Sequence, residues 1–200
     1  MYCGPAHRKA VALTFDDGPS ESTPELLQLL ANQKVTATFF QCGANVRRLP
    51  QIARDVAEAG HELGNHSDSH ASMLFRGKEF MRSELTAAQG SILQATGRRP
   101  ALFRPPFGYL WFGLGQVQRE LGLAGVMWTT IAGDWKLPAA EIVSRLRGGL
   151  RNGAIFCLHD GRHLTPNPDI RNTVEALRRI IPEFLDQGYR LETVSQLVRP

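Results

Sequence analysis

The chain has 200 residues, a net charge of +4 and a hydrophobic fraction of 42%, which suits one folded domain and excludes an intrinsically disordered chain. Its lysines and arginines are scattered and are not interleaved with aromatic residues, so we expect no nucleic-acid surface. No stretch approaches the roughly 18 consecutive apolar residues of a membrane span, and we expect no such span.

The first half of the chain alternates short apolar runs with longer helical patterns. Its expected elements, in chain order, are strand 10–15, helix 23–33, strand 35–43, helix 50–60, strand 61–66 and helix 77–97. Thr23 followed by Pro24 predicts a helix N-cap and a first helical position. The spacing within the last helix predicts that Leu85, Ile92 and Leu93 share one side of it.

The second half continues this alternation. Its expected elements are strand 101–106, helix 115–122, strand 124–131, helix 138–149, strand 153–160, helix 173–188 and a strand with a short helix in 189–197. Pro182 is expected to interrupt its helix near the middle. About seven strands, apolar on both faces, predict a single α/β domain over residues 1–200, in which helices cover a parallel barrel or open sheet.

The three cysteines, Cys3, Cys42 and Cys157, are odd in number and form no closely spaced pair, so neither a disulfide framework nor a thiolate zinc site is indicated. Cys42 and Cys157 lie in apolar runs and are expected to be buried thiols. Residues 1–10 contain no apolar segment typical of a signal peptide. The chain as given is expected to be cytoplasmic, or extracytoplasmic if a preceding segment was removed, and no oligomeric state is indicated.

Ionisable residues recur where the expected strands end. In a barrel or an open parallel sheet, the carboxyl ends of the strands form the functional edge, so these side chains are expected to share one site. They are Asp16 and Asp17, His66 and His70, Arg104, Asp134, and His159.

The stretch "HSDSH" provides two of these groups at a spacing of four. On a helical turn, His66 and His70 would lie on one face and could chelate one ion, although this spacing is also common on solvated helices. Two histidines and a carboxylate form a typical open catalytic zinc site, and either Asp16 or Asp17 could supply the carboxylate. The other could accept a proton from the attacking water, if the turn at Gly18 brings both into one cavity.

Five motifs, "TFDDGPS", "HSDSH", "RPPFG", "DW" and "LHD", occur in the order and spacing of the NodB-homology domain of the carbohydrate esterase family 4 polysaccharide deacetylases, which the chain resembles from about residue 11 to 197. The resemblance implies a distorted (β/α) barrel and a divalent metal, usually zinc, with cobalt, nickel or manganese as alternatives. It also implies hydrolysis of N-acetyl groups on acetylated amino-sugar polymers or oligosaccharides, of the chitooligosaccharide or peptidoglycan type.

The resemblance also implies roles for single residues. Asp16 matches the catalytic base, and Arg104 matches the arginine that pairs with it and orients it. The metal ligands would be Asp17, His66 and His70.

The remaining motifs match the acid side of the reaction and the substrate pocket. His159 matches the general acid and Asp134 the carboxylate that tunes it. The chain near Phe107 resembles the wall that offers a backbone N–H to the oxyanion, while Trp135 and Leu158 match the apolar lining of the acetyl pocket.

Two positions depart from the family pattern. Ile131 stands where the fourth motif often has an aspartate, which implies a change in the support behind the site. Cys157 stands where the fifth motif has leucine, which implies a slightly reshaped pocket.

Several other residues have no matched role. His61 is expected to be structural, and His163 lies in a loop over the site, where it contacts substrate or only solvent. Trp111 and Phe112 are expected either to stack against sugars or to pack under a helix.

Three other functions compete with deacetylation of glycans. A phosphatase of the haloacid dehalogenase type is disfavoured, because the two aspartates are adjacent and that chemistry has no use for a histidine pair. A pseudoenzyme that only binds acetylated glycans should have lost part of the set, which is complete here. A metal-dependent amidase of a small ureide or imide is disfavoured by the compact chain, which has no lid insertions.

Overall fold

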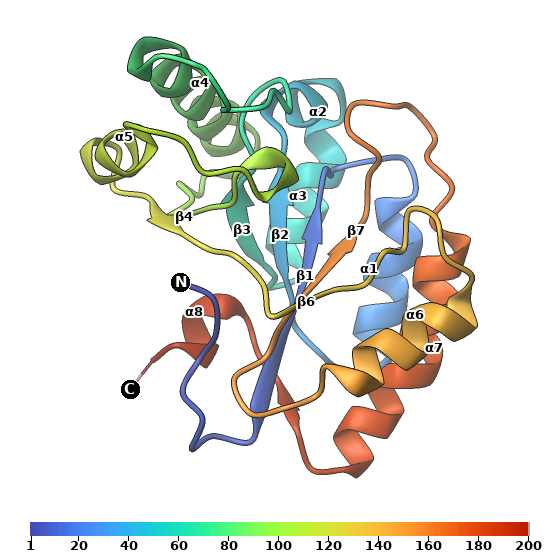
Figure 1. Ribbon diagram of the computed structural model, residues 1–200. Coiled ribbons are helices and arrows are strands. Elements are labelled where there is room, and N and C mark those ends of the chain that lie inside the picture. The colour runs from blue at the N-terminus through green and yellow to red at the C-terminus, as the bar shows by residue number, and fades with distance from the viewer. Residues whose placement is uncertain (200) are drawn as a thin grey trace.

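The computed structural model describes residues 1–199, and a curled parallel sheet forms its centre (Figure 1). The strands run in the order β5-β4-β3-β2-β1-β7-β6, and β8 pairs with the beginning of β1. All of these pairings are parallel, and β5 and β6 stand at the two ends of the order, so the sheet is an incomplete barrel. This confirms the expected distorted barrel. The strands are β1 (Ala10–Asp16), β2 (Thr38–Gln41), β3 (Glu62–Asn65), β4 (Leu102–Phe103), β5 (Ala124–Gly125), β6 (Thr130–Ile131), β7 (Ile155–His159) and β8 (Arg190–Leu191).

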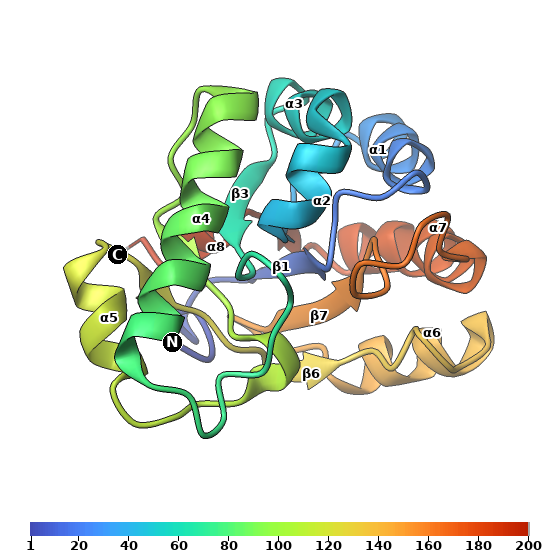
Figure 2. The same cartoon turned by 90° about the horizontal axis from the view of Figure 1, so that it is seen from above.

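Helices follow one another around the outside of the sheet, as the view from above shows (Figure 2). The adjacent pairs α3–α4, α1–α3, α1–α7 and α6–α7 pack together. Within residues 1–199, no helix is long and apolar enough to cross a membrane. The helices are α1 (Thr23–Asn32), α2 (Gly43–Arg48), α3 (Pro50–Glu58), α4 (Lys78–Thr96), α5 (Leu114–Glu120), α6 (Ala139–Gly148), α7 (Arg171–Asp186), α8 (Val194–Leu197) and a 3₁₀ turn at Pro106–Gly108.

Successive side chains of β1 point to opposite faces of the sheet, and the two faces differ in size and polarity. Val11, Leu13 and Phe15 pack into the main core beneath the outer helices. Ala10 and Ala12 belong to a smaller cluster on the other face. The small residues on this inner face leave room inside the half-barrel for larger polar groups.

The central strand β7 divides its side chains in the same way. Phe156 and Leu158 join the main core, whereas Ile155 lies in the inner cluster. The register pairs Cys157 with Thr14 and His159 with Asp16 across β1. These inward positions of β1 and β7 therefore lie side by side.

The expected strand 124–131 is wrong as a single element. Its two ends form β5 and β6, at opposite ends of the sheet. The residues between them pass along the inner side, where the carbonyl oxygens of Val126 and Met127 accept hydrogen bonds from Arg104. This buried guanidinium holds the segment out of a regular strand.

Three helix predictions also need correction. Pro182 does not interrupt α7, whose burial of Ile180, Ile181 and Phe184 on both sides of the proline holds it as one helix. Thr23 is the first helical residue and Ser22 the N-cap, because the Thr23 hydroxyl instead accepts a hydrogen bond from the Ser20 N–H.

The third correction concerns the buried side of α4. Leu85 and Ile92 are fully buried, but Leu93 is 41% exposed. Residue 93 lies one position, about 100°, further round the helix than Ile92, and this rotation carries its side chain to the edge of the buried face.

Replacing Ile92 by alanine is expected to lower the free energy of unfolding by about 2–5 kcal/mol, because a cavity is left in a fully packed core. Leu93→Ala, one position along on the exposed edge, is expected to change it by only about 0.5 kcal/mol. Urea unfolding followed by circular dichroism measures both values. Equal losses for the two variants would contradict the packing of α4.

Candidate active site

A cavity of about 520 Å³ opens at the carboxyl ends of β1, β3 and β7. Most residues predicted to form the site line this cavity, and two others, Arg104 and Asp134, are buried behind its wall. The predicted residues that line it are Asp16, Asp17, His66, His70, Phe107, Trp135 and His159.

Arg104 anchors the first carboxylate. Its guanidinium Nη1 donates to Asp16 Oδ1 at 2.7 Å and to the Thr14 hydroxyl at 2.6 Å. The Arg104 side chain is fully buried and lies over the ring of Phe40, with 4.2 Å from Cζ to the ring centroid. This holds Asp16 Oδ1 in place and leaves Oδ2 toward the cavity, as a general base requires.

A turn sends the second carboxylate toward a different set of partners. Asp17 has a φ of 74°, in the left-handed region, so its side chain departs from the alternation of the strand. The next residue has to be glycine, because a Cβ at Gly18 would collide with the buried carboxylate of Asp160. The Asp160 carboxyl accepts a hydrogen bond from Thr23, and its burial raises its pKa to about 7.

Asp17 and two histidines form a three-ligand cluster. Asp17 Oδ1 lies 3.3 Å from His66 Nε2 and 3.0 Å from His70 Nε2. Donors bound to a tetrahedral zinc ion are roughly 3.3 Å apart. These three residues therefore fit a metal ion with an open position for catalysis.

The two histidines do not lie on a helical turn, so that part of the prediction is wrong. Residues 66–70 form a loop in which Ser67 and His70 both have positive φ, and the loop brings the two rings to the same side. His66 Nδ1 lies 2.7 Å from the carbonyl oxygen of Arg104, which can only accept a hydrogen bond. As a metal ligand, His66 would therefore carry its proton on Nδ1 and direct the Nε2 lone pair at the ligand cluster.

His163 closes the other side of this cluster. Its backbone N–H donates to Asp17 Oδ2 at 2.7 Å, and its ring Nδ1 lies 3.0 Å from His70 Nδ1. Asn45 donates to the carbonyl oxygens of both Asp17 and His163, which ties the loop to the end of β1. His163 thus supports two candidate metal ligands, a role beyond the contact with substrate or solvent considered from the sequence.

His159 and Asp134 form the acidic side of the site. Their side chains meet at 2.8 Å, between Nδ1 and Oδ1, and Asp134 Oδ2 accepts from the His159 backbone N–H and from Thr173. Burial alone would lower the pKa of His159, but the hydrogen bond and charge of Asp134 raise it to about 9. The imidazole is therefore protonated at neutral pH and can donate a proton.

Leu158 is not part of the cavity, so its predicted place in the acetyl pocket is wrong. It is fully buried in the main core, because alternation along β7 directs it away from the inner face. Its neighbour Cys157 lines the cavity instead, and the Cys157 thiol donates a hydrogen bond to Asp16 Oδ2, with 3.4 Å between sulfur and oxygen. Ile131, the other departure from the family pattern, also lines the cavity.

Phe107 and Trp135 are both at the cavity wall and both partly exposed. The Trp135 ring meets His159 edge to face, with centroids 5.2 Å apart. Phe107 has a φ of 60°, and among the described residues its backbone N–H has no hydrogen-bond partner, which leaves it available to a ligand.

Three residues without a matched role, His61, Trp111 and Phe112, lie away from the cavity. His61 is structural as expected, since it is buried and its Nδ1 accepts a hydrogen bond from the Ala37 N–H. Trp111 packs against a hydrophobic cluster below α4 and α5, while its neighbour Phe112 is 85% exposed, and neither lines the cavity.

Several supporting residues were missed from the sequence, among them Thr14, Thr173, Asn45 and Trp128. Thr14 could have been found, because it lies two positions before Asp16 and so shares its face of the strand. Thr173 and Asn45 gave no signal, because helices far away in the sequence carry them to the site, and Trp128 lies in the segment that was taken for one strand.

Comparison with known proteins finds relatives along nearly the whole chain. The family model described as "Polysaccharide deacetylase" matches residues 4–126. A peptidoglycan-N-acetylglucosamine deacetylase of Bacillus cereus is 37% identical over 199 residues, which cover 98% of this chain and 91% of the relative. A chitooligosaccharide deacetylase of Sinorhizobium fredii is 33% identical over 198 residues, which cover 94% of this chain and 91% of that relative.

Solved structures share the fold. The Bc1960 peptidoglycan N-acetylglucosamine deacetylase has a TM-score of 0.93 at 31% identity, covering 98% of this chain and 91% of its own. BA3943 from Bacillus anthracis, a CE4 family pseudoenzyme, has a TM-score of 0.91 at 27% identity, covering 100% of this chain and 68% of its own. Because a pseudoenzyme has so similar a fold, the fold alone does not show catalytic activity, which depends on the side chains in the cavity.

Truncation of His163 to alanine is expected to weaken metal binding by about 10–100-fold, because His70 loses the group that orients it. Competition with a chromogenic chelator measures the affinity. His7→Ala, which alters an exposed histidine near the N-terminus, is the matched control. A metal affinity in His163→Ala equal to that of the control would remove the supporting role.

Asp134→Asn is expected to shift the alkaline limb of the rate profile to lower pH by about one unit or more. His159 has a raised pKa and acts in its protonated form, so activity is lost as pH rises through that value. Without the negative charge of Asp134, the pKa falls and the loss begins earlier. Values of kcat/KM, obtained from initial rates between pH 6 and about 10, give the profile. An alkaline limb at the same pH in both proteins would contradict the pairing of Asp134 with His159.

Proposed function

The chain belongs to the polysaccharide deacetylase family, whose members are metal-dependent hydrolases, and we propose that it uses zinc to remove N-acetyl groups from N-acetylglucosamine-containing glycans. Polymers of the peptidoglycan and chitooligosaccharide types are the proposed substrates, in line with the names of the relatives. Two imidazoles and one carboxylate are a donor set typical of catalytic zinc, which is why zinc is proposed ahead of cobalt, nickel or manganese.

One observation carries the proposal: a carboxylate and an imidazole stand side by side at one edge of a cluster of three candidate metal ligands. Asp16 and His159 are in register on β1 and β7, and both line the cavity that Asp17 enters. Amide hydrolysis needs a base for the attacking water and an acid for the leaving amine. These two residues can supply the two roles to a single substrate.

The residues act in a definite order. When bound, the metal ion supplies Lewis acidity, which polarises the acetyl carbonyl and lowers the pKa of a nearby water. Asp16, held at Oδ1 by Arg104, accepts a proton from the attacking water at Oδ2. The free N–H of Phe107 donates to the acetyl oxygen as negative charge develops on it. His159 then gives its proton to the sugar nitrogen, while Asp134 keeps the imidazole oriented and charged.

Two of the competing functions can be weighed against this arrangement. A pseudoenzyme would lack part of the base, acid or ligand set, and all of these groups are present and in contact with suitable partners. A small ureide or imide is disfavoured as substrate, because two exposed aromatic residues, Phe107 and Trp135, border the cavity and suit the faces of sugar rings.

Acetate release from chitooligosaccharides and peptidoglycan is expected after reconstitution with zinc and is expected to stop on chelation. Cobalt, nickel and manganese are compared at equal loading, and acetylated xylan and a small ureide serve as the alternative substrates. The Asp16→Asn variant should lose about 10²–10⁴-fold in rate while retaining bound metal, as measured by mass spectrometry. Acetate release that survives chelation, or turnover of the ureide alone, would refute the proposal.

A further inference from the structure

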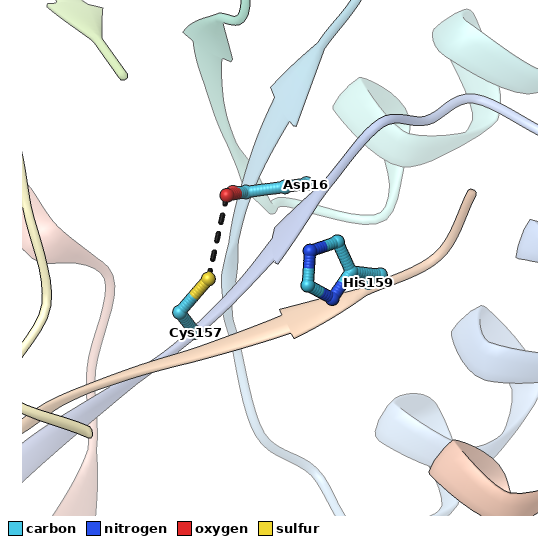
Figure 3. A group of neighbouring side chains, drawn as sticks. All are labelled: Asp16, Cys157 and His159. Carbon is cyan, nitrogen blue, oxygen red and sulfur yellow. Dashed lines mark hydrogen bonds between the residues drawn. The ribbon is translucent and has the colours of Figure 1, made fainter. Parts of the chain in front are cut away.

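A second group of metal-binding atoms lies on the inner face of the half-barrel, next to the first. Asp16, Cys157 and His159 each offer one ligand atom, and these atoms all lie within 4.8 Å of one another (Figure 3). The group shares no residue with Asp17, His66 and His70. We propose that Asp16, Cys157 and His159 form a second binding site, inhibitory when filled, for a thiophilic divalent cation such as Zn²⁺ or Cd²⁺.

The three side chains converge because of strand register. Asp16 is paired with His159 across β1 and β7, and Cys157 lies two residues before His159 on the same face. All three line the cavity, so an ion that reaches the candidate catalytic centre also reaches them. Cys157 Sγ is 3.4 Å from Asp16 Oδ2, and the sticks in Figure 3 show these two atoms facing each other.

Each residue retains one atom for an ion after its structural contacts are made. Asp16 Oδ1 is bound by Arg104, which leaves Oδ2. His159 Nδ1 is bound by Asp134, which leaves Nε2. The Cys157 sulfur has only its weak contact with Asp16. The remaining donors are one oxygen, one sulfur and one nitrogen.

This mixed set selects a particular class of cation. Thiolate favours Zn²⁺ and softer ions over Mg²⁺, Ca²⁺ and Mn²⁺, which prefer oxygen donors. The leucine that the family pattern has at position 157 would offer no donor, so the site depends on Cys157. On binding, the thiol and the imidazole of His159 each release a proton to solvent, and no oxidation or reduction occurs.

The second ion should bind more weakly than the first. Arg104 already neutralises Asp16 at 2.7 Å, and Asp16 Oδ2 is only 4.0 Å from His66 Nε2 of the first cluster. A cation at the second site is therefore repelled by the guanidinium and by an ion in the first site. Zinc should activate at low concentration and inhibit at higher concentration.

Inhibition follows from the roles of two of the ligands, and this part of the inference depends on the proposed function. An ion on Asp16 Oδ2 removes the base, and an ion on His159 Nε2 removes the acid. Binding itself requires only the three side chains, so it can be tested without any catalytic assay.

The test uses the full chain with Cys3→Ser as the background, because Cys3 is an exposed thiol. The first site is loaded with zinc, Cd²⁺ is then titrated, and the ultraviolet thiolate-to-cadmium absorption is recorded. We expect the absorption to saturate at one further equivalent and to disappear in Cys157→Leu. In activity assays, we measure the zinc concentration that halves each protein's own maximal rate. This concentration should be roughly tenfold or more higher in Cys157→Leu than in the background protein.

Cys157→Ser and Cys157→Ala are measured alongside, so that the site remains testable if leucine at position 157 prevents folding. An unchanged absorption in all three variants, or no absorption in the background protein, would overturn the inference. Absence of absorption with normal acetate release refutes only the second site. Cadmium absorption without any acetate release refutes the proposed function and leaves the second site in place.

Discussion

The buried guanidinium of Arg104 is the constraint on which the rest of the site depends. A charged group removed from water is costly unless it is paired and hydrogen-bonded. Arg104 uses four of its five N–H donors, on the carboxylate of Asp16, the hydroxyl of Thr14, and the carbonyl oxygens of Val126 and Met127. These partners come from β1 and from the segment after β5. The hydrogen bonds of Arg104 therefore fix the carboxylate of Asp16. They also hold the segment after β5 on the inner side of the half-barrel, so that the expected strand 124–131 is divided into β5 and β6.

Strand alternation then determines which chemistry reaches the cavity. The inward side of β1 is small at Ala10 and Ala12 and polar at Thr14 and Asp16, which leaves space for the arginine. The inward side of β7 ends in a thiol and an imidazole, in register with those polar residues. Because the sheet is parallel and curled, the carboxyl ends of these strands meet at one edge, and the base and acid become neighbours without any long loop to carry them.

The sequence allowed prediction of much of this arrangement, because polar residues at the ends of apolar strands are unusual and their edge is common to all strands. Leu158 was misplaced because its role came from the family resemblance alone, although its position next to His159 already puts it on the opposite face of the strand. The loop geometry of His66 and His70 was missed because a spacing of four suits a helical turn equally well. The contact between His163 and His70 spans 93 positions and depends on tertiary folding, so no local pattern could have predicted it.

The adjacent carboxylates at the end of β1 have partners that differ in kind. Asp16 has a permanent cation in Arg104. Among residues 1–199, Asp17 has no lysine or arginine partner; its Oδ1 faces two buried imidazoles, and its Oδ2 accepts from the His163 backbone N–H. A neutral His66 that donates its Nδ1 proton to the Arg104 carbonyl oxygen turns a lone pair toward the Asp17 oxygen 3.3 Å away. A lone pair facing a carboxylate is favourable only with a cation between them. The protein thus provides the positive charge for its base and leaves the charge opposite Asp17 to a metal ion.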